Sequence, residues 1–514
     1  MKRCPQCGRE YDNSMMFCLD DGAELLYGPA SDEPATAILS SAEAKTAVLN
    51  AGSANAPNSI AVLPFTHMSW AEDDEYFCDG LAEELINALS KIDQLKVPAR
   101  TSAFSFKGKD THISEIAQKL GVRTILEGSV RKSGDRMRIT VQLINAADGY
   151  HLWSERYDRE FKDVFDVQDE ITLAVVDALK VKLLGDEKAA VLKRGTENAK
   201  AYELYMRGRF LWNRRTIGDF EKAIEQFQMA IEIDPTYALA YSGLADCLLF
   251  LGYYEAYSPA DAALKAKQAV TKALAMDDSL AEAQASMAVY KMYFEFDWRG
   301  GEAGLRKAIE LNPKLPTARY WYCSFLDALG RFDESIEQGR VAHELDPLDL
   351  ITLNNIARTL THAGRHDEAI DLALKTLEIA PEFYVTHWAL GVVYLKIGKL
   401  DEAVERFRFA AAKSSLLFLR AYLGFALALS GNTAEARQIL AELHAEGKRT
   451  YVSPLCICLV HIGLGEIETA LDLLEDAWTM KTVLLIWIKT EPVFDALRDE
   501  PRFNDLVMKM RFAD

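Results

Sequence analysis

A step of 34 residues recurs through the second half of the chain and restricts its fold more than any other feature. Pro313, Pro347 and Pro381 follow one another at this interval (347 − 313 = 34 and 381 − 347 = 34), and one further step reaches Ser415. The phrases LRKAIELNP, GRVAHELDP and LALKTLEIAP end at these prolines, and upstream FQMAIEIDP ends at Pro235. A fixed period of this size indicates stacked supersecondary units and not one globular core.

Three copies extend such a phrase into a longer frame that starts at a turn glycine, whereas the copy that ends in LRKAIELNP lacks this glycine. GRFDESIEQGRVAHELDP, GRHDEAIDLALKTLEIAP and GKLDEAVERFRFAAAKSS strongly resemble the tetratricopeptide repeat (TPR), a helix pair that stacks into a solenoid. In the most regular copy, residues 384–417, Gly391 and Ala403 are small so that the paired helices approach closely, and Phe407 fills the space between pairs. The resemblance implies about eight units over residues 195–482, and one pair alone could not bury its apolar face.

Composition excludes several broad classes of function. The 514 residues carry 58 Lys and Arg against 77 Asp and Glu, a net charge of −19. Binding along a nucleic-acid backbone needs a basic face, although a small local basic patch is compatible with this charge. No apolar run reaches the roughly 18 residues of a membrane helix, and no apolar stretch of a signal peptide follows Lys2 and Arg3. Eight cysteines in so long a chain fit a reducing compartment, so we expect a cytoplasmic protein without membrane insertion.

The first 26 residues have the spacing of a small zinc ribbon. Cys4 and Cys7 form a C-x2-C turn, and Cys18 starts a second turn in which Asp21 occupies the place of a fourth cysteine. A carboxylate is an acceptable zinc ligand, so we expect a structural Zn²⁺ held by Cys4, Cys7, Cys18 and Asp21. Alternatively, the fourth ligand is absent and the thiols are free. A segment this short cannot fold on its apolar core alone.

Residues 27–58 have the composition of a linker. They are rich in Ala, Ser, Pro and Asn, and no aromatic residue follows Tyr27. Such a segment cannot bury enough apolar surface to fold, which predicts a flexible tether. The phrases TAIL and TAVL leave open a docking role, but a passive linker is the simpler interpretation.

Residues 59–186 have the pattern of an α/β domain. SIAVLPF and LKVPAR are short runs of strand type, whereas FCDGLAEELINALSKI and HISEIAQKLG have apolar residues at helical spacing. From Arg136 to Leu143 polar and apolar residues alternate, which predicts a strand with one buried and one wet face. The element order β-α-β-α-β-β-β-α indicates a two-layer domain.

Several phrases of this region closely resemble the TolB-like domain that precedes TPR repeats in bacterial signalling proteins. These are AVLPF, DGLAEELINAL, ARTSAFSFKGK, FDVQDEI and the long stretch LGVRTILEGSVRKSGDRMRITVQLINAADGYHLWSERYDRE. In such proteins the pair often follows a protein kinase, a nucleotide cyclase or a winged-helix DNA-binding domain. Here the zinc head takes that place, so no catalytic or DNA-binding activity is carried over from the resemblance.

The α/β region shows no catalytic constellation. FKGKD lacks the frame of a phosphate-binding loop. Glu83 and Glu84 lie on a predicted helix, for which a solvent-facing side is the expected interpretation, and Cys78 is expected to be a packed cysteine. We therefore expect a non-enzymatic protein with no catalytic residues.

Function in a TPR array is expected on the concave face, which the first helix of each pair forms. Arg358 and Lys396 could hold a carboxylate of a bound peptide, and Trp388 and Tyr422 could supply flat apolar area. The alternative is that each of these side chains packs between repeats or faces water. The predicted groove residues are Tyr320, Asn354, Arg358, Trp388, Lys396 and Tyr422.

The expected fold class is multidomain α/β plus all-α. Its parts are a zinc ribbon (1–26), a linker (27–58), a TolB-like domain (59–186), a TPR solenoid (195–482) and a C-terminal cap (483–514). We expect a protein–protein interaction scaffold or adaptor in bacterial signalling that binds a peptide or protein segment in its groove, with self-association as a further option. Two alternatives are a transcription-associated regulator that contacts nucleic acid through the zinc head, and a sensor or regulatory subunit related to TolB–TPR kinases and cyclases.

Overall fold

The chain forms two compact units, Met1–Ala56 and Pro57–Asp514. The computed structural model describes residues 2–3, 10–11, 26–27, 58–68, 75–133, 136–183 and 185–512. In the first unit, the two-residue strand β1 (Lys2–Arg3) pairs antiparallel with β2 (Glu10–Tyr11) and with β3 (Leu26–Tyr27). The predicted zinc ligands Cys4, Cys7, Cys18 and Asp21 lie outside the described residues, as does the predicted linker except for its two end residues.

The second unit opens with a mixed sheet in the order β6-β4-β7-β8-β9, with β5 paired to β7. Its strands are β4 (Asn58–Val62), β5 (Thr66–His67), β6 (Leu95–Lys96), β7 (Thr124–Ser133), β8 (Arg136–Asn145) and β9 (His151–Glu160). Strand β4 runs parallel to β6 and β7, whereas β7, β8 and β9 form an antiparallel meander. On β8, Met137 and Ile139 are buried while Arg136 and Arg138 are exposed, so the predicted alternation is confirmed.

Helices cover both faces of this sheet, so the predicted two-layer arrangement is wrong. These helices are α2 (Glu75–Ser90), α3 (Arg100–Phe104), α4 (Ile113–Leu120), the 3-10 turn η2 (Phe161–Asp163), α5 (Val164–Ala178) and α6 (Gly185–Val191). Ile60 and Val62 of β4 belong to the core that includes α2 and α5, whereas Ala61 packs with Leu120 of α4, which adds a third layer against the face that Ala61 presents. Gly121 ends α4 with a φ of +63°, the left-handed conformation that such a helix stop needs.

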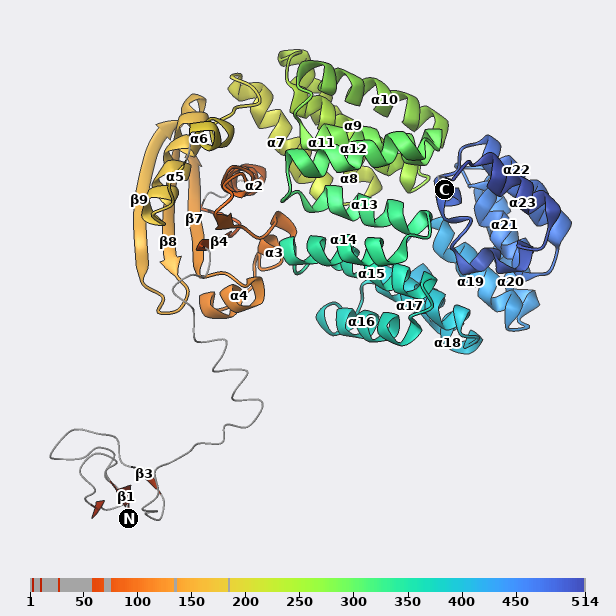
Figure 1. Cartoon of the computed structure of the whole chain (residues 1–514). Coiled ribbons are helices and arrows are strands. Elements are labelled where there is room, and N and C mark those ends of the chain that lie inside the picture. The colour runs from red at the N-terminus through yellow and green to blue at the C-terminus, as the bar shows by residue number, and fades with distance from the viewer. Residues whose placement is uncertain are drawn as a thin grey trace. The chain divides into compact units, whose positions relative to one another are not determined.

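Eight helix pairs follow in the described part of the chain, and in Figure 1 they stack side by side from green to blue. No helix in the described ranges is both long and apolar enough to cross a bilayer. The pairs are α7 (Ala199–Asn213) and α8 (Ile217–Ile233), α9 (Ala238–Tyr253) and α10 (Pro259–Met276), α11 (Ala281–Tyr290) and α12 (Trp298–Leu311), α13 (Pro316–Ala328) and α14 (Phe332–Leu345), α15 (Leu350–His362) and α16 (His366–Ile379), α17 (Tyr384–Lys396) and α18 (Leu400–Lys413), α19 (Leu417–Leu429) and α20 (Thr433–Glu446), and α21 (Pro454–Gly463) and α22 (Ile467–Thr479); the π-helical turn η3 (Lys291–Glu295) follows α11.

The small and large residues of the regular repeat pack as the sequence predicts. Phe407 and Ala403 of α18 are fully buried. A Cβ atom built at Gly391 of α17 would overlap the Phe407 ring, so only glycine lets the two helices approach this closely. The first pair repeats the arrangement, because Phe227 of α8 lies against Gly208 and also against Gly243 of the next pair.

One residue in the turn within each pair has a positive φ. In the last five pairs this residue is a glycine: Gly330, Gly364, Gly398, Gly431 and Gly465. In the first three pairs it is Arg215, Glu255 and Phe296, with φ values of +58°, +54° and +54°. The first pairs therefore carry side chains in a conformation that residues other than glycine adopt only at a cost.

The α/β part packs against the repeats at several places. Arg209 of α7 donates to Glu83 Oε1 from Nε and Nη2 at 3.1 and 2.9 Å, and Arg100 contacts Glu83 Oε2 at 2.9 Å. Glu83 is thus buried in this junction, and the expectation of a solvent-facing side was wrong because α7 covers this face of α2. Glu84 is half-buried, and burial and the neighbouring Glu83 raise its pKa to about 7. Cys78 is buried, as the packed interpretation predicts.

Two turns of later repeats also contact the α/β part. The Asp346 carboxylate, just after α14, accepts hydrogen bonds from the Ser102 amide at 2.8 Å and from the Ser102 hydroxyl, and Figure 1 shows α3 beside α14. Lys314 Nζ donates to the carbonyl oxygens of Ile92 and Leu95 at 2.5 and 3.1 Å. Residues of the repeats therefore contact residues of the α/β part that lie more than 200 positions earlier in the chain.

The C-terminal segment does more than cover the last helix pair. Its elements are η4 (Val483–Trp487), η5 (Pro492–Leu497) and α23 (Pro501–Lys509). Turn η4 packs against α9, α13 and η3, and η5 packs against α17 and α21. The segment therefore runs along the first helices of several repeats.

Candidate functional site

A chamber of about 1040 Å³ lies on the side of the repeats that their first helices form. Its wall includes residues of α9, α13, α15, α17, α19 and α21, with α2 and α3 from the α/β part and with η4 and η5 from the C-terminal segment. The volume reaches the upper end of the roughly 300–1,000 Å³ that is usual for ligand sites. The chamber is therefore large enough for a ligand but is bounded by the protein's own C-terminal segment.

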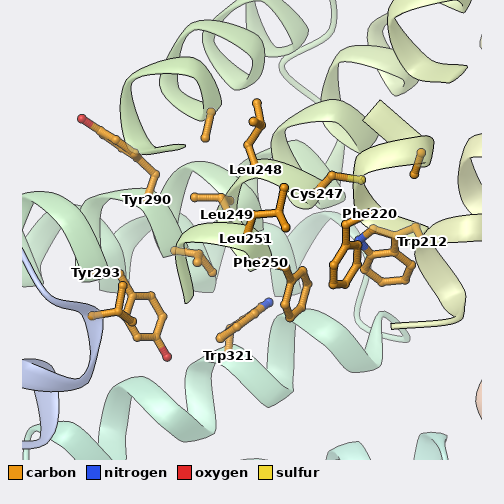
Figure 2. Packing of buried hydrophobic residues seen from close by; sticks show 14 of the residues in the cluster. Trp212, Phe220, Cys247, Leu248, Leu249, Phe250, Leu251, Tyr290, Tyr293 and Trp321 are labelled. Atoms are coloured by element: carbon orange, nitrogen blue, oxygen red, sulfur yellow. The ribbon is translucent and has the colours of Figure 1, made fainter. Parts of the chain in front are cut away.

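Aromatic side chains make up much of the wall. Phe250 packs on Trp212 and on Trp321, with ring centroids 5.9 and 5.7 Å apart, and Figure 2 shows these three rings close together. Further along the repeats, Trp388 and Tyr422 of the same wall meet edge to face at 5.6 Å. Rings of this kind bury large flat areas with little loss of side-chain freedom, so the wall is suited to an apolar or aromatic ligand.

Five of the six predicted groove residues line this one chamber. They are Tyr320, Asn354, Arg358, Trp388 and Tyr422. Lys396 is not part of the wall, because its Nζ forms an ion pair with Asp495 Oδ2 at 2.7 Å. The structure thus brings together the residues that the repeat pattern selects, with one exception.

The C-terminal segment already uses several of these side chains. The Arg358 guanidinium stacks on the Trp487 ring, 4.2 Å from its centroid, and its Nε pairs with Asp327 Oδ2 at 3.2 Å. Both cations that the sequence analysis assigned to a peptide carboxylate therefore have carboxylate partners within the protein, Asp327 and Asp495. The groove is therefore narrowed by η4 and η5.

A buried charge network holds the segment in place. His362 Nδ1 lies 2.8 Å from Asp327 Oδ1, and His362 Nε2 lies 3.3 Å from Glu491 Oε2. Burial alone would lower the pKa of His362, but Asp327 and Glu491 raise it to about 9. The imidazole is thus a cation at neutral pH, and its role is to bridge α13 to the loop before η5.

Many polar atoms in the wall have no hydrogen-bond partner among the described residues. Four of the residues, Asn354, Arg358, Trp487 and Glu491, are no more than 5% exposed, and leaving such groups unpaired is costly. The unpaired atoms are Trp212 Nε1, Glu255 Oε1, Asn354 Oδ1, Arg358 Nη2, Trp388 Nε1, Tyr451 Oη, Trp487 Nε1 and Glu491 Oε1. Water or a ligand in the chamber must supply their partners.

Sequence reasoning missed two wall residues, Arg215 and Glu255. Both occupy the turn position that glycine holds in the regular repeats. The repeat frame contains the signal, because it shows where the glycine should stand and that a charged residue replaces it. The groove prediction considered only the first helix of each pair, so this substitution in a turn was not connected with a site.

Family models match four segments of the chain. Residues 56–174 match the second domain of HilA/YgeH-like transcriptional regulators. Residues 215–252, 350–380 and 417–442 match models of the tetratricopeptide repeat. The chain therefore carries TPR repeats, as the 34-residue step predicts, whereas the TolB-like name for residues 59–186 stays a prediction.

Two curated relatives match parts of the chain. "Putative adenylate cyclase 3" of Rhizobium meliloti (strain 1021) is 43% identical over 187 residues, which covers 36% of this chain and 32% of the cyclase. The peroxisomal targeting signal receptor of Candida albicans is 34% identical over 74 residues, which covers 14% and 12%. This chain thus spans about a third or less of the length of each of these relatives.

Among solved structures, YrrB is described as a TPR protein with an unusual peptide-binding site. It is 21% identical, with a TM-score of 0.27, and the match covers 38% of this chain and 94% of YrrB. The likeness is too low for a comparison of sites.

Proposed function

We propose that this chain is a non-catalytic interaction protein of a signalling system and that it receives a short segment of a partner protein in the chamber. The observation that carries the proposal is a single chamber whose wall combines aromatic rings with eight unpaired polar atoms. A peptide supplies apolar side chains that can pack on these rings, and backbone donors and acceptors that can pair with these polar atoms.

The bound segment is short in this proposal, because the protein's own residues occupy part of the groove. Val483, Leu485 and Ile486 of η4 are fully buried, so η4 is a permanent part of the wall. What remains is the chamber between α3, the first helices of the repeats and η4–η5. A long helix or an extended strand that runs through the whole solenoid is not the ligand that this space favours.

Photo-crosslinking tests the proposal and identifies the partner in the same experiment. A benzophenone amino acid replaces Trp388 in the wall, and in a matched control it replaces Met229, which is 46% exposed on α8 and does not line the chamber. We expect the Trp388 position to yield crosslinks to one short segment of a protein, identified by tandem mass spectrometry. Crosslinks from the Met229 position alone would contradict the proposal.

A second candidate function is a regulator of transcription. It is favoured by the match of residues 56–174 to the second domain of HilA/YgeH-like transcriptional regulators and by the basic residues Lys2, Arg3 and Arg9 at the N-terminus. In this case the full chain should shift labelled duplex DNA at low salt, and the shift should disappear as salt rises. The absence of a shift even at low salt would remove this candidate. Cyclase activity is not proposed, since the cyclase relative is matched over 32% of its length.

A further inference from the structure

The turn residues of the first two pairs place a guanidinium group and a carboxyl group in the chamber. Arg215 lies in the turn between α7 and α8, and Glu255 lies in the turn between α9 and α10. A residue other than glycine in this left-handed conformation costs about 1–2 kcal/mol, and such strain gathers at functional sites. Both side chains line the chamber.

Arg215 presents a cation that lacks an anionic partner. Its guanidinium carbon lies 3.7 Å from the Trp212 ring centroid and 4.6 Å from that of Phe250. Within the described ranges no carboxylate forms a salt bridge with it, although Asp349 acts on its charge from farther away. The stacked rings hold the guanidinium in place and leave its N–H edge for an acceptor.

Glu255 presents a carboxyl group that lacks a cationic partner within the described part of the chain. Its Oε1 is buried without a hydrogen-bond partner among the described residues. Its neighbours are Tyr451, Cys456 and Ser453, whose hydroxyl hydrogen-bonds the carboxyl group, and none of them is a cation. Burial raises the pKa of Glu255 to about 8, which reflects a carboxyl group that lacks a positive partner.

The two groups lie in the turns of successive helix pairs and line the same chamber. Phe250, which contacts Arg215, lies 6.0 Å from the ring of Tyr254, and Tyr254 immediately precedes Glu255. The two turns belong to successive pairs, whose helices pack about 8–10 Å apart. A separation of this order is spanned by about three extended residues.

We propose that Arg215 and Glu255 form a two-point receptor, so that the chamber selects a peptide segment with a carboxylate that binds Arg215 and a lysine ammonium that binds Glu255. The aromatic rings between the two points pack on the intervening side chains. The inference rests on the proposed function, because it names the chemistry of the segment that the chamber receives.

A cation at a turn residue with positive φ does not by itself belong to the chamber. Lys481, after α22, also has a positive φ of +57°, and its ammonium also stacks on aromatic rings, 4.4 Å from Trp478 and 4.9 Å from Phe296. Yet Lys481 does not line the chamber. It is therefore a matched control for a stacked cation at a strained turn outside the site.

Peptide selection by the full chain tests the proposal. The probe is a synthetic library of six-residue peptides, acetylated and amidated at their ends. Each peptide carries either Glu or Gln at one position and either Lys or Gln at another, with apolar residues elsewhere. Peptides that co-elute with the protein in gel filtration are quantified by mass spectrometry. The wild-type protein should retain the class with both Glu and Lys at least about tenfold over the class with neither, as one charge-assisted hydrogen bond predicts.

The variants assign each preference to its residue. Arg215→Gln should remove the preference for Glu and keep that for Lys, and Glu255→Gln should do the reverse. Lys481→Gln should change neither. If Arg215→Gln does not fold, Arg215→Lys keeps the charge and should keep the preference for Glu.

Two results would overturn the inference, and they have different consequences. Retention of all four peptide classes equally, or preferences that both variants keep, would reject the two-point receptor and leave the proposed function standing. Retention of no peptide by the wild-type chain, together with no crosslink from the Trp388 position, would reject both.

Discussion

Lys396 of α17 forms an ion pair with Asp495 of η5, with Nζ and Oδ2 2.7 Å apart. The lysine belongs to the face on which a TPR array is expected to hold its ligand, and the aspartate belongs to the same chain. The C-terminal segment is thus bound along its own repeats as a ligand would be. Because the segment occupies part of the groove, only the chamber is left for a ligand.

Removal of the Trp487 side chain should destabilise the protein strongly. The ring is 4% exposed, stacks on Arg358 and lies 6.1 Å from the Tyr293 ring. Trp487→Ala should therefore lower the free energy of unfolding by about 3–5 kcal/mol. Met508→Ala, at a side chain that is 67% exposed, is the control in the same denaturant titration. A loss below about 1 kcal/mol would show that the segment is only loosely attached.

The pair Gly391 and Phe407 should behave as a coupled unit. Gly391→Ala places a methyl group against the Phe407 ring and should cost about 1–3 kcal/mol of stability. Phe407→Leu alone should also destabilise, because it removes part of a fully buried ring. The double variant should lose less than the sum of the two, since the smaller side chain makes room for the methyl group. Strictly additive losses in a double-mutant cycle would refute the steric account.

Strain at the turn of the second pair should be measurable. Glu255→Gly relieves the positive φ and removes an unpaired carboxyl, so we expect an increase in stability of about 1 kcal/mol. Phe296→Gly relieves the same backbone strain but removes a ring that is 7% exposed and stacked on Trp478 at 5.0 Å, so this variant should be less stable. Thermal unfolding of both variants gives the comparison. A destabilised Glu255→Gly protein would mean that Glu255 supports the fold.

The contact between α3 and the turn after α14 should depend on pH. Burial and the nearby Asp349 raise the pKa of Asp346 from 3.8 to about 7, against the lowering effect of the Ser102 hydrogen bonds. The folded state holds this proton where the unfolded state has lost it, so stability falls as pH rises from about 4 to about 7.

Asp346→Asn keeps an acceptor for the Ser102 amide and has no proton to lose. The difference in unfolding free energy between variant and wild type should therefore grow in favour of the variant between about pH 4 and about pH 7. Chemical denaturation at several pH values measures it. A difference that is constant across this window would contradict the assignment.

We propose that the N-terminal cysteines bind structural zinc, on the sequence spacing alone. Freshly purified, reduced protein should contain close to one zinc per chain by elemental analysis. Cys7→Ser should lose most of it, whereas Cys78→Ser, at a buried cysteine of the α/β part, should keep it. Asp21→Ala separates the two alternatives for the fourth ligand, since it lowers zinc affinity only where Asp21 is a ligand.

Local packing could be predicted from the sequence because it repeats. The 34-residue step places Gly391, Ala403 and Phe407 in one frame, and the structure packs them together. The alternation on β8 is equally local. Five of the six groove residues reach one chamber for the same reason, since equivalent helix positions face the same side of a solenoid.

Contacts between segments that are far apart in the sequence could not be predicted from the 34-residue repeat. Nothing in the repeat frame shows that Asp495 reaches Lys396, or that Asp346 returns to Ser102, which lies 244 residues earlier. Glu83 was assigned to a wet face because one helix pattern does not reveal that α7 covers it. Arg215 and Glu255 lie in irregular copies, so their place in the wall depends on how the whole array curves.

Hydrogen exchange locates the bound segment most directly. The full chain is measured with and without a synthetic copy of the segment crosslinked at the Trp388 position. The first amides of a helix have no partner within it, and Thr317 and Val385 stand at such places in the chamber wall. The account predicts slower exchange at these amides and unchanged exchange in the outer helices α14, α16 and α18. Protection confined to those outer helices would contradict the central claim that the chamber is the binding site.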